Sequence, residues 1–275
     1  MLLLEGEHYD KLNEPLSQVR INNLFARSVI ESHVTGKVYV DNRAEPSTYY
    51  IVHPYGISLL FGRCDNKDFN NSFRDYALNT YKFRDKYEWM QAYPDNWDNV
   101  LNELFHGCII KSSVNMDDRA KDKIELNTRV NFKFNIEKYR DFKKNNRADL
   151  QIVRTNKQLF NEMKGSVIPS YFWDSVDDFD AKGVGFSILS NNELASTAYS
   201  AFIHGDKLEI GIETTEKFRG KGFAQYSCSR LIDYCIDNRY EPIWSCKLEN
   251  ISSFKLAQKL GFEPTIKIPF YRLNK

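Results

Sequence analysis

The sequence lacks a long hydrophobic run. No stretch approaches the roughly 18 continuous apolar residues of a membrane-spanning helix. Met1 and three leucines are followed at once by Glu5, which leaves no room for the apolar region of a signal peptide. We therefore expect a cytoplasmic protein without a membrane partner.

Cysteine is also scarce, with 5 residues in 275 and no Cys-x-x-Cys pair to begin a zinc site. The odd number predicts free thiols in a reducing compartment and no bound metal. Cys228 and Cys235 share an apolar helical stripe and are predicted to lie in the core. Cys246 invites a covalent acyl-enzyme interpretation, which is disfavoured because no histidine accompanies it in the sequence.

No charge of one sign is in excess. Lysine and arginine number 38 and aspartate and glutamate 37, a formal net charge of +1 with neutral histidines. Nucleic-acid-binding domains usually carry a basic excess, so no nucleic-acid partner is expected. The length suits two domains of modest size, and apolar residues at 42% suffice for a sizeable core.

The most informative stretch covers residues 207–224, KLEIGIETTEKFRGKGFA. Leu208, Ile210 and Ile212 alternate with polar residues and glycine, which predicts a strand. A polar turn with Gly220 and Gly222 follows and opens a predicted helix. Main-chain N–H groups at a helix N-terminus have no intrahelical acceptor and attract anions, so this turn is a candidate phosphate site.

The spacing of these glycines excludes two common phosphate loops. It is neither Gly-x-x-x-x-Gly-Lys-Ser/Thr nor Gly-x-Gly-x-x-Gly. Residues 219–224 match Arg/Gln-x-x-Gly-x-Gly/Ala, a short pattern that is weak when it stands alone. A second pattern, NISSFKLAQKLGF at residues 250–262, follows after one predicted helix and one predicted strand.

Together the two patterns resemble the signatures of the GNAT acetyltransferase superfamily. More narrowly, IGIET, FRGKGFA and PIWSC, with Trp173 and Val184-Gly185-Phe186 upstream, resemble the zwittermicin A resistance type. The resemblance covers residues 150–275 well and the first half of the chain loosely. It implies a GNAT fold, in which a mixed, mostly antiparallel sheet is flanked by helices.

The predicted elements agree with this α/β (α+β) class. After residue 150 the patterns predict β-α-β-β-β-α-β-α-β, with a helix at 156–163 capped by Thr155 and a hairpin turn at Asn191-Asn192. Residues 143–149 are polar and predict a linker. We expect residues 1–142 to form an additional α/β domain, for which a degenerate GNAT-like fold is one option, and residues 150–275 to form the acetyltransferase domain. The predicted elements of residues 1–142 are helices at 15–32, 70–79 and 97–105 and strands at 37–41, 47–53, 57–62 and 125–134.

The resemblance implies acetyl-CoA as cosubstrate. Its pantetheine arm would lie where the central strand parts from the next strand, around Thr214 and Trp244. Asn250 is equally well explained as a helix N-cap alone. The residues implied in cofactor binding are Ile212 and Thr214 on the strand, Arg219, Gly220, Lys221, Gly222, Phe223 and Ala224 in the turn, and Asn250 and Ser253.

The implied chemistry is direct attack of an amine on the thioester. Glu213 is the first candidate base and Glu209 the second, although either can instead bind a cationic acceptor or form an ordinary salt bridge. Many GNAT enzymes carry a tyrosine acid where this chain has Ala257. Tyr226, Tyr271 or water are then the candidate proton donors for the thiolate.

The resemblance favours an N-acetyltransferase for a primary amine of a small molecule, such as an aminopolyol antibiotic. A non-catalytic CoA-binding or regulatory module and a protein or peptide acetyltransferase are the alternatives. A homodimer is compatible with the sequence.

Overall fold

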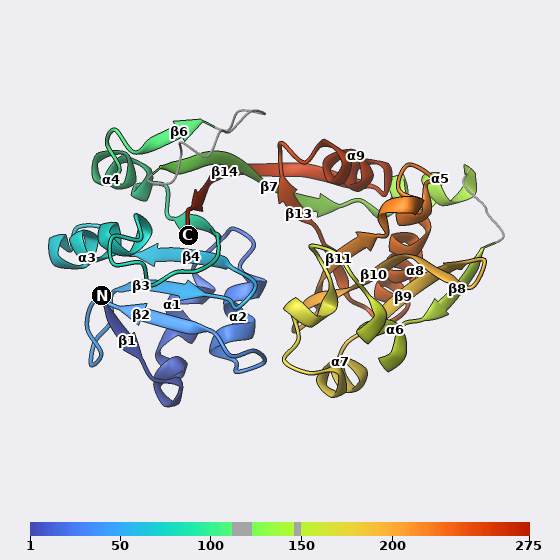
Figure 1. The fold of residues 1–275 in the computed structure, drawn as a ribbon, viewed down its shortest axis with the longest axis horizontal. Helices are drawn as coiled ribbons and strands as arrows, with labels where there is room; N and C mark the ends of the chain where they lie inside the picture. The colour runs from blue at the N-terminus through green and yellow to red at the C-terminus, as the bar shows by residue number, and fades with distance from the viewer. Residues whose placement is uncertain (112–122, 146–149) are drawn as a thin grey trace. The chain divides into compact units, whose positions relative to one another are not determined.

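The structure is a computed structural model that describes residues 1–111, 123–145 and 150–275. The chain forms two compact units. The first unit comprises Met1–Val130, Lys247–Glu249 and Lys267–Lys275, and the second comprises Asn131–Cys246 and Asn250–Ile266. Strands β7 (Ile124–Phe134) and β14 (Phe262–Leu273) each contribute residues to both units (Figure 1). Among the described residues no helix is long and apolar enough to cross a membrane.

The division between the units follows residue 130, whereas the sequence predicts a boundary at 143–149. Residues 143–145 belong to helix α5 (Ile136–Asn145), and residues 146–149 lie outside the described residues. The predicted linker therefore stays a prediction.

The first unit contains most of a nine-stranded sheet, in which the strands follow in the order β1-β2-β3-β4-β5-β14 and β7 is the next neighbour of β14. From β1 to β14 in this order, neighbouring strands are antiparallel except for the parallel pair β4 and β5. A short strand, β6 (Ile109–Lys111), pairs in parallel with β7. The other strands are β1 (Leu2–Leu4), β2 (Lys37–Val40), β3 (Thr48–Val52), β4 (Ile57–Gly62) and β5 (Glu88–Tyr93).

The helices of the first unit bury aromatic side chains. Phe73 of α3 and Trp97 of α4 lie in one core with Tyr50 and Tyr271 of the sheet. These helices agree with the predicted ones at 70–79 and 97–105. The helical elements are η1 (Gly6–Leu12), α1 (Asn13–Ser17), α2 (Leu24–Ile30), α3 (Lys67–Ala77) and α4 (Trp97–Leu104).

The single helix predicted at 15–32 is wrong, because the chain breaks it into α1 and α2. The Asn23 side chain donates to the carbonyls of Leu16 and Val19, at 3.4 and 3.1 Å, and so satisfies acceptors that a continuous helix would satisfy with main-chain N–H groups. The neighbouring Asn22 carbonyl accepts a hydrogen bond from the Gln91 side chain at 2.6 Å.

The second unit contains a five-stranded sheet with the order β12-β11-β10-β9-β8. Only β11 and β12 are parallel, and the other neighbours are antiparallel. Asn191 and Asn192 adopt positive φ in the turn between β9 and β10, as the hairpin prediction requires. The strands are β8 (Gln151–Arg154), β9 (Gly185–Ser190), β10 (Glu193–His204), β11 (Lys207–Thr214) and β12 (Glu241–Ile243).

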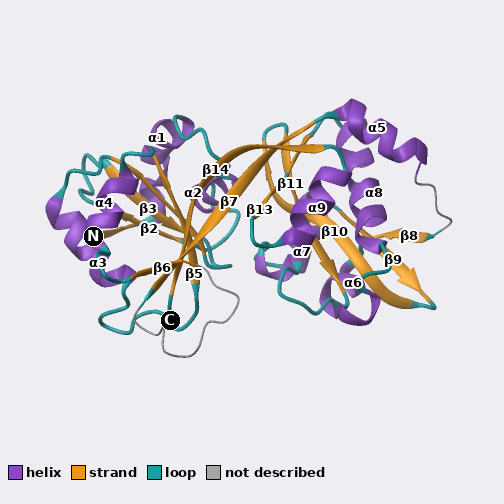
Figure 2. Cartoon of the chain, turned by 90° about the horizontal axis from the view of Figure 1, so that it is seen from above, coloured by secondary structure: helices purple, strands orange, loops and turns teal. Residues whose placement is uncertain are grey.

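Helix α8 (Phe223–Asp237) packs along β9, β10 and β11, and α9 (Ile251–Lys259) contacts α8 (Figure 2). The buried face of α8 includes Cys228, Leu231 and Cys235, as the apolar stripe predicts. The remaining helical elements of this unit are α5, α6 (Lys157–Glu162), η3 (Pro169–Tyr171), α7 (Val176–Lys182) and η4 (Glu216–Phe218).

Two local predictions in the second unit need correction. Helix α6 is capped by Asn156, whose side chain accepts from the Leu159 N–H, and not by Thr155. Thr155 instead shares a 2.9 Å hydrogen bond with Ser187 and is buried. The strand predicted at 241–246 is two strands, β12 and β13 (Ser245–Lys247), because β12 pairs with β11 and β13 with β7.

Candidate functional site

The second half of β11 has an edge that β12 does not cover. Parallel pairing joins Lys207–Glu209 to Glu241–Ile243 and ends there, while pairing with β10 continues to Thr214. Trp244 is the residue between β12 and β13, and its carbonyl accepts from Phe132 of β7. The central strand β11 and the next strand β12 thus part after Glu209 and Ile243, next to the predicted Trp244 but earlier on β11 than the predicted Thr214. Main-chain groups on such an edge are available to an extended ligand.

The turn after β11 has the backbone of an anion site. Gly220 and Gly222 adopt φ of +75° and +81°, conformations that glycine reaches without strain. Gly222 is the N-cap residue of α8 and has no side chain to satisfy the first N–H groups of the helix. These groups and the helix dipole favour a negatively charged ligand here.

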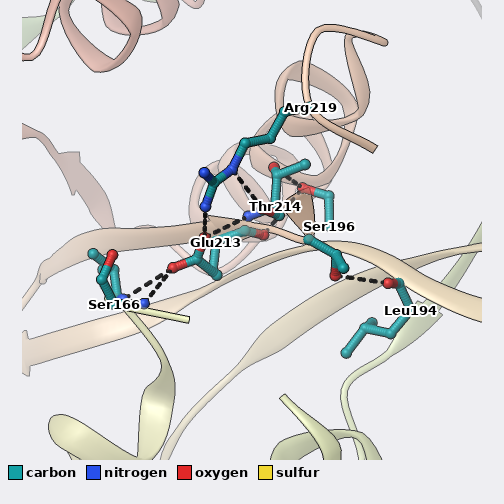
Figure 3. A network of polar contacts seen from close by, with 8 residues as sticks. Ser166, Leu194, Ser196, Glu213, Thr214 and Arg219 are labelled. Carbon is teal, nitrogen blue, oxygen red and sulfur yellow. Dashed lines mark hydrogen bonds and ion pairs between the residues drawn. The ribbon is translucent and has the colours of Figure 1, made fainter. Parts of the chain in front are cut away.

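Glu213 lies at the end of β11 and uses both carboxylate oxygens (Figure 3). Its Oε2 accepts the N–H groups of Ser166 and Val167, at 2.9 and 3.0 Å. Its Oε1 accepts the N–H of Thr214 at 3.2 Å and lies 3.4 Å from the Arg219 guanidinium. The side chain is 9% exposed. The first candidate base is therefore a buried carboxylate that joins three stretches of chain.

Small hydroxyl residues fix the end of β11 from the other side. Ser196 of β10 donates to the Glu213 carbonyl at 3.3 Å and shares a 2.9 Å hydrogen bond with Thr214. Thr215 donates to the Leu194 carbonyl at 2.9 Å. The predicted cofactor residue Thr214 is consequently held by its side chain, and its carbonyl accepts from Arg219 Nε at 3.2 Å.

Glu209, the second candidate base, lies where the pairing of β11 with β12 ends. The residue is 5% exposed, and its Oε1 accepts a 2.7 Å hydrogen bond from Ser245 of β13. Glu209 and Glu213 therefore occupy different surroundings on one strand. Glu213 faces main-chain N–H groups and an arginine, whereas the Glu209 carboxylate is bound by a hydroxyl.

Asn250 is the N-cap of α9. Its side chain accepts from the Ser253 N–H at 3.2 Å and from the Ser252 hydroxyl at 2.8 Å. Ser253 Oγ in turn accepts from the indole N–H of Trp244 at 3.3 Å. The capping interpretation is thus confirmed, and a cofactor contact in addition remains a prediction.

The Leu-Gly-Phe end of the second signature has a structural cause. Gly261 has φ of +88°, and a Cβ placed on it would lie 2.7 Å from the Tyr139 nitrogen and 2.8 Å from the Asn135 carbonyl oxygen. Only glycine allows this approach of two main-chain segments. Ala257, which the resemblance places where a tyrosine acid is expected, is fully buried.

The remaining candidates are mostly structural. Cys228, Cys235 and Cys246 are free and buried, and burial raises the pKa of the Cys235 thiol to about 12. Tyr271 belongs to the core of the first unit, where burial raises its pKa. Tyr226 packs with Phe223 against a small apolar cluster. In the described ranges no cluster of acidic, histidine and cysteine residues could hold a metal ion.

The aromatic run near residue 172 divides between core and surface. Phe172 is buried beside Tyr199 and Phe202, and the Trp173 indole donates to the Ser200 carbonyl at 2.9 Å. Tyr171 is 45% exposed.

Sequence reasoning missed the main-chain donors of Ser166 and Val167 and the hydroxyl of Ser196, because neither a main-chain group nor a single serine marks a site in a sequence.

Comparison with known proteins identifies the family. The model of the GNAT acetyltransferase family matches residues 15–271. The chain is 29% identical over 247 residues to "Uncharacterized N-acetyltransferase YdfB" of Bacillus subtilis (strain 168), a match covering 90% of this chain and 89% of that protein.

Two solved structures are similar in fold. The GCN5-related N-acetyltransferase-like protein of Streptococcus suis is 18% identical, with a TM-score of 0.69 over 96% of this chain and 98% of that one. A tandem GNAT protein from the clavulanic acid biosynthesis pathway is 9% identical, with a TM-score of 0.59 over 98% and 97% of the two chains. The fold class predicted from the sequence is confirmed, and the chain belongs to the GNAT acetyltransferase family.

Proposed function

We propose that this N-acetyltransferase uses acetyl-CoA to acetylate a primary amine of a small molecule. The observation that carries the proposal is the end of β11, where an edge free of β12 leads directly into a glycine turn at the N-terminus of α8. The extended pantetheine arm of acetyl-CoA can form hydrogen bonds along this strand edge, and the pyrophosphate at its end fits the anion site of the turn.

The cofactor contacts follow from this placement. The pantetheine amides would bond to the main chain of β11 at Ile212 and Thr214. The N–H groups of the turn, from Arg219 through Gly220, Lys221, Gly222 and Phe223 to Ala224, would hold the pyrophosphate. Asn250 and Ser253, at the start of α9, complete the site, and no metal is needed to hold the phosphates.

The reaction joins the amine nitrogen to the thioester carbonyl carbon and breaks the carbon–sulfur bond. The amine must first lose a proton, for which Glu213 and Glu209 are the candidate acceptors, directly or through water. Starting from the ammonium form, the nitrogen loses one proton before the attack and a second as the amide forms. The thiolate gains one proton, and one proton is released overall. Because Ala257 offers no acid, water or Tyr226 protonates the thiolate.

The acceptor class rests on the resemblance to the zwittermicin A resistance type. That resemblance favours an amine carried by a polyhydroxylated small molecule. The likeness in fold to a tandem GNAT protein along 98% of the chain supports a degenerate GNAT-like origin for the first unit.

The test is thermal unfolding with and without millimolar acetyl-CoA, in the wild type and in Gly222→Glu. Ligand at about a hundred times its dissociation constant stabilises the folded state by about 2.7 kcal/mol. We expect a clear rise of Tm in the wild type and none in the variant, whose carboxylate occupies the anion site. No rise in the wild type contradicts the proposal.

A non-catalytic CoA-binding module is the second candidate, favoured by the buried Ala257 at the usual position of the acid. Release of free CoA with a panel of small amines distinguishes the two. Turnover with any amine supports the enzyme, whereas cofactor binding without turnover across the panel supports the binding module.

A further inference from the structure

Glu213 is surrounded by groups that donate to it. Three main-chain N–H groups and one guanidinium converge on its two oxygens, and the shortest contacts are those to Ser166 and Val167 (Figure 3). A proton acceptor must have a lone pair that faces the substrate, but the lone pairs of Glu213 face these donors. The geometry is that of an anchor for the chain.

The loop at residues 165–167 has a glycine where the Glu213 carboxylate approaches it. A Cβ on Gly165 would lie 2.3 Å from Glu213 Oε2 and 2.4 Å from its carboxyl carbon. Gly165 has φ of +156°. Because Gly165 has no side chain, the carboxylate can reach the N–H groups of Ser166 and Val167. The loop and Glu213 are therefore held together.

The same carboxylate reaches the phosphate turn through Arg219. Two contacts hold the guanidinium, one to Glu213 Oε1 and one from Nε to the Thr214 carbonyl. An arginine has five N–H donors, so these contacts leave others to face a phosphate group. Since the Arg219 side chain is 61% exposed, it is accessible to such a ligand.

We propose that Glu213 is a positioning residue that joins the 165–167 loop to Arg219 of the cofactor turn, and is not the base. The inference rests on the proposed function, because it assigns a role within the acetyl-CoA site. It leaves Glu209 as the base candidate on β11. The carboxylate orders the loop through hydrogen bonds and orients Arg219 through its charge.

Two readouts test the proposal without knowledge of the acceptor. Amide hydrogen exchange at Ser166 and Val167 reports on the loop, and calorimetric titration with CoA reports on the turn. The variants are Glu213→Gln, which keeps one carbonyl oxygen but loses the charge, Glu213→Ala, which loses both, and Arg219→Ala. Glu216→Gln is the matched control, because it removes an exposed charge from the same turn.

We expect exchange at both amides to accelerate at least about tenfold in Glu213→Ala and much less in Glu213→Gln. Glu213→Gln should weaken CoA binding roughly two- to fivefold, the range of an ion pair whose arginine is exposed to solvent, and Glu216→Gln should not. Arg219→Ala should weaken CoA binding more than Glu213→Gln does, because it also removes the donors that face the phosphate. Glu213→Gln should then add little further loss in the Arg219→Ala background.

The proposal is overturned if Glu213→Gln and Glu213→Ala leave both amides and the CoA affinity at wild-type values. If Glu213 had a merely structural role, Glu213→Gln would keep wild-type CoA affinity. That result would also overturn the proposal. If the wild type does not bind CoA, the proposed function fails, and the amides alone decide the role of Glu213. Faster exchange in Glu213→Ala then supports loop positioning, and unchanged exchange overturns it.

Discussion

Gly165 and Glu213 are complementary, since the missing side chain of one makes room for the carboxylate of the other. A Cβ on Gly165 would fall 2.3 Å from Glu213 Oε2, far inside van der Waals contact. The sequence predicts a helix at 156–163 that ends just before this glycine, and α6 ends at Glu162. The Glu213 carboxylate is a second reason why position 165 must be glycine, and this one involves two segments far apart in the sequence.

Gly165→Ala should therefore destabilise the protein and loosen the loop. We expect a loss of about 1–3 kcal/mol in the free energy of unfolding, from the clash and the unfavourable φ together. Urea denaturation measures it. In a Glu213→Ala background the same change should cost clearly less, because the clashing atoms are gone. Equal costs in both backgrounds would contradict the complementarity.

Gly261→Ala should cost more, because its Cβ would meet main-chain atoms of Asn135 and Tyr139 that cannot rotate away. We expect about 2–4 kcal/mol. The matched control is Gly205→Ala, whose φ of +57° is also positive but whose Cβ would meet nothing within 4 Å. It should show only the conformational cost of a left-handed backbone, about 1–2 kcal/mol. If thermal denaturation gives the same loss for both variants, the close approach has no energetic effect.

The sequence predicts the elements around the site well because their signals are local. The alternation of Leu208 and Ile210, the glycines of the turn and the cap of α9 at Asn250 all act within a few residues. The family resemblance predicts that the strands part around Thr214 and Trp244. In the structure the pairing of β11 with β12 ends at Glu209 and Ile243, next to Trp244 but earlier on β11 than Thr214.

Features that depend on distant partners could not be predicted. Strand β5 was missed because its buried Glu88 and Gln91 interrupt the apolar pattern that marks a strand. The helix break at Asn23 depends on side-chain bonds that compete with helix formation. Glu213 looks like an exposed strand end in the sequence, because the partners of its Oε2 are main-chain groups more than forty residues earlier.

Asn250 allows a cap to be separated from a cofactor contact. Asn250→Ala should lower the free energy of unfolding by about 1 kcal/mol, because α9 loses its N-cap. Asn250→Ser keeps a good cap and should restore most of that stability. If Asn250 also binds the pantetheine amides, CoA affinity stays reduced in Asn250→Ser, as calorimetric titration would show. Wild-type affinity in the serine variant would leave Asn250 with the cap alone.

Glu88 makes the stability of the first unit depend on pH. The residue is buried, and Tyr76 donates to its Oε2 at 2.8 Å, while Tyr50 contacts Oε1. Burial raises the pKa of Glu88 to about 8, against an opposing effect of Lys37. Near neutral pH the folded protein therefore keeps a proton that the unfolded chain has lost, because an unfolded glutamate has a pKa of about 4.3.

The folded state binds more protons across this interval, so the contribution of Glu88 to stability falls as pH rises from the unfolded pKa toward the folded one. The slope from one group is at most about 1.4 kcal/mol per pH unit. Glu88→Gln cannot ionise and should flatten the decline of Tm between pH 5 and about 8. Exposed Glu103 supplies the control, since Glu103→Gln should keep the wild-type slope. An unchanged slope in Glu88→Gln would mean that another group binds the proton.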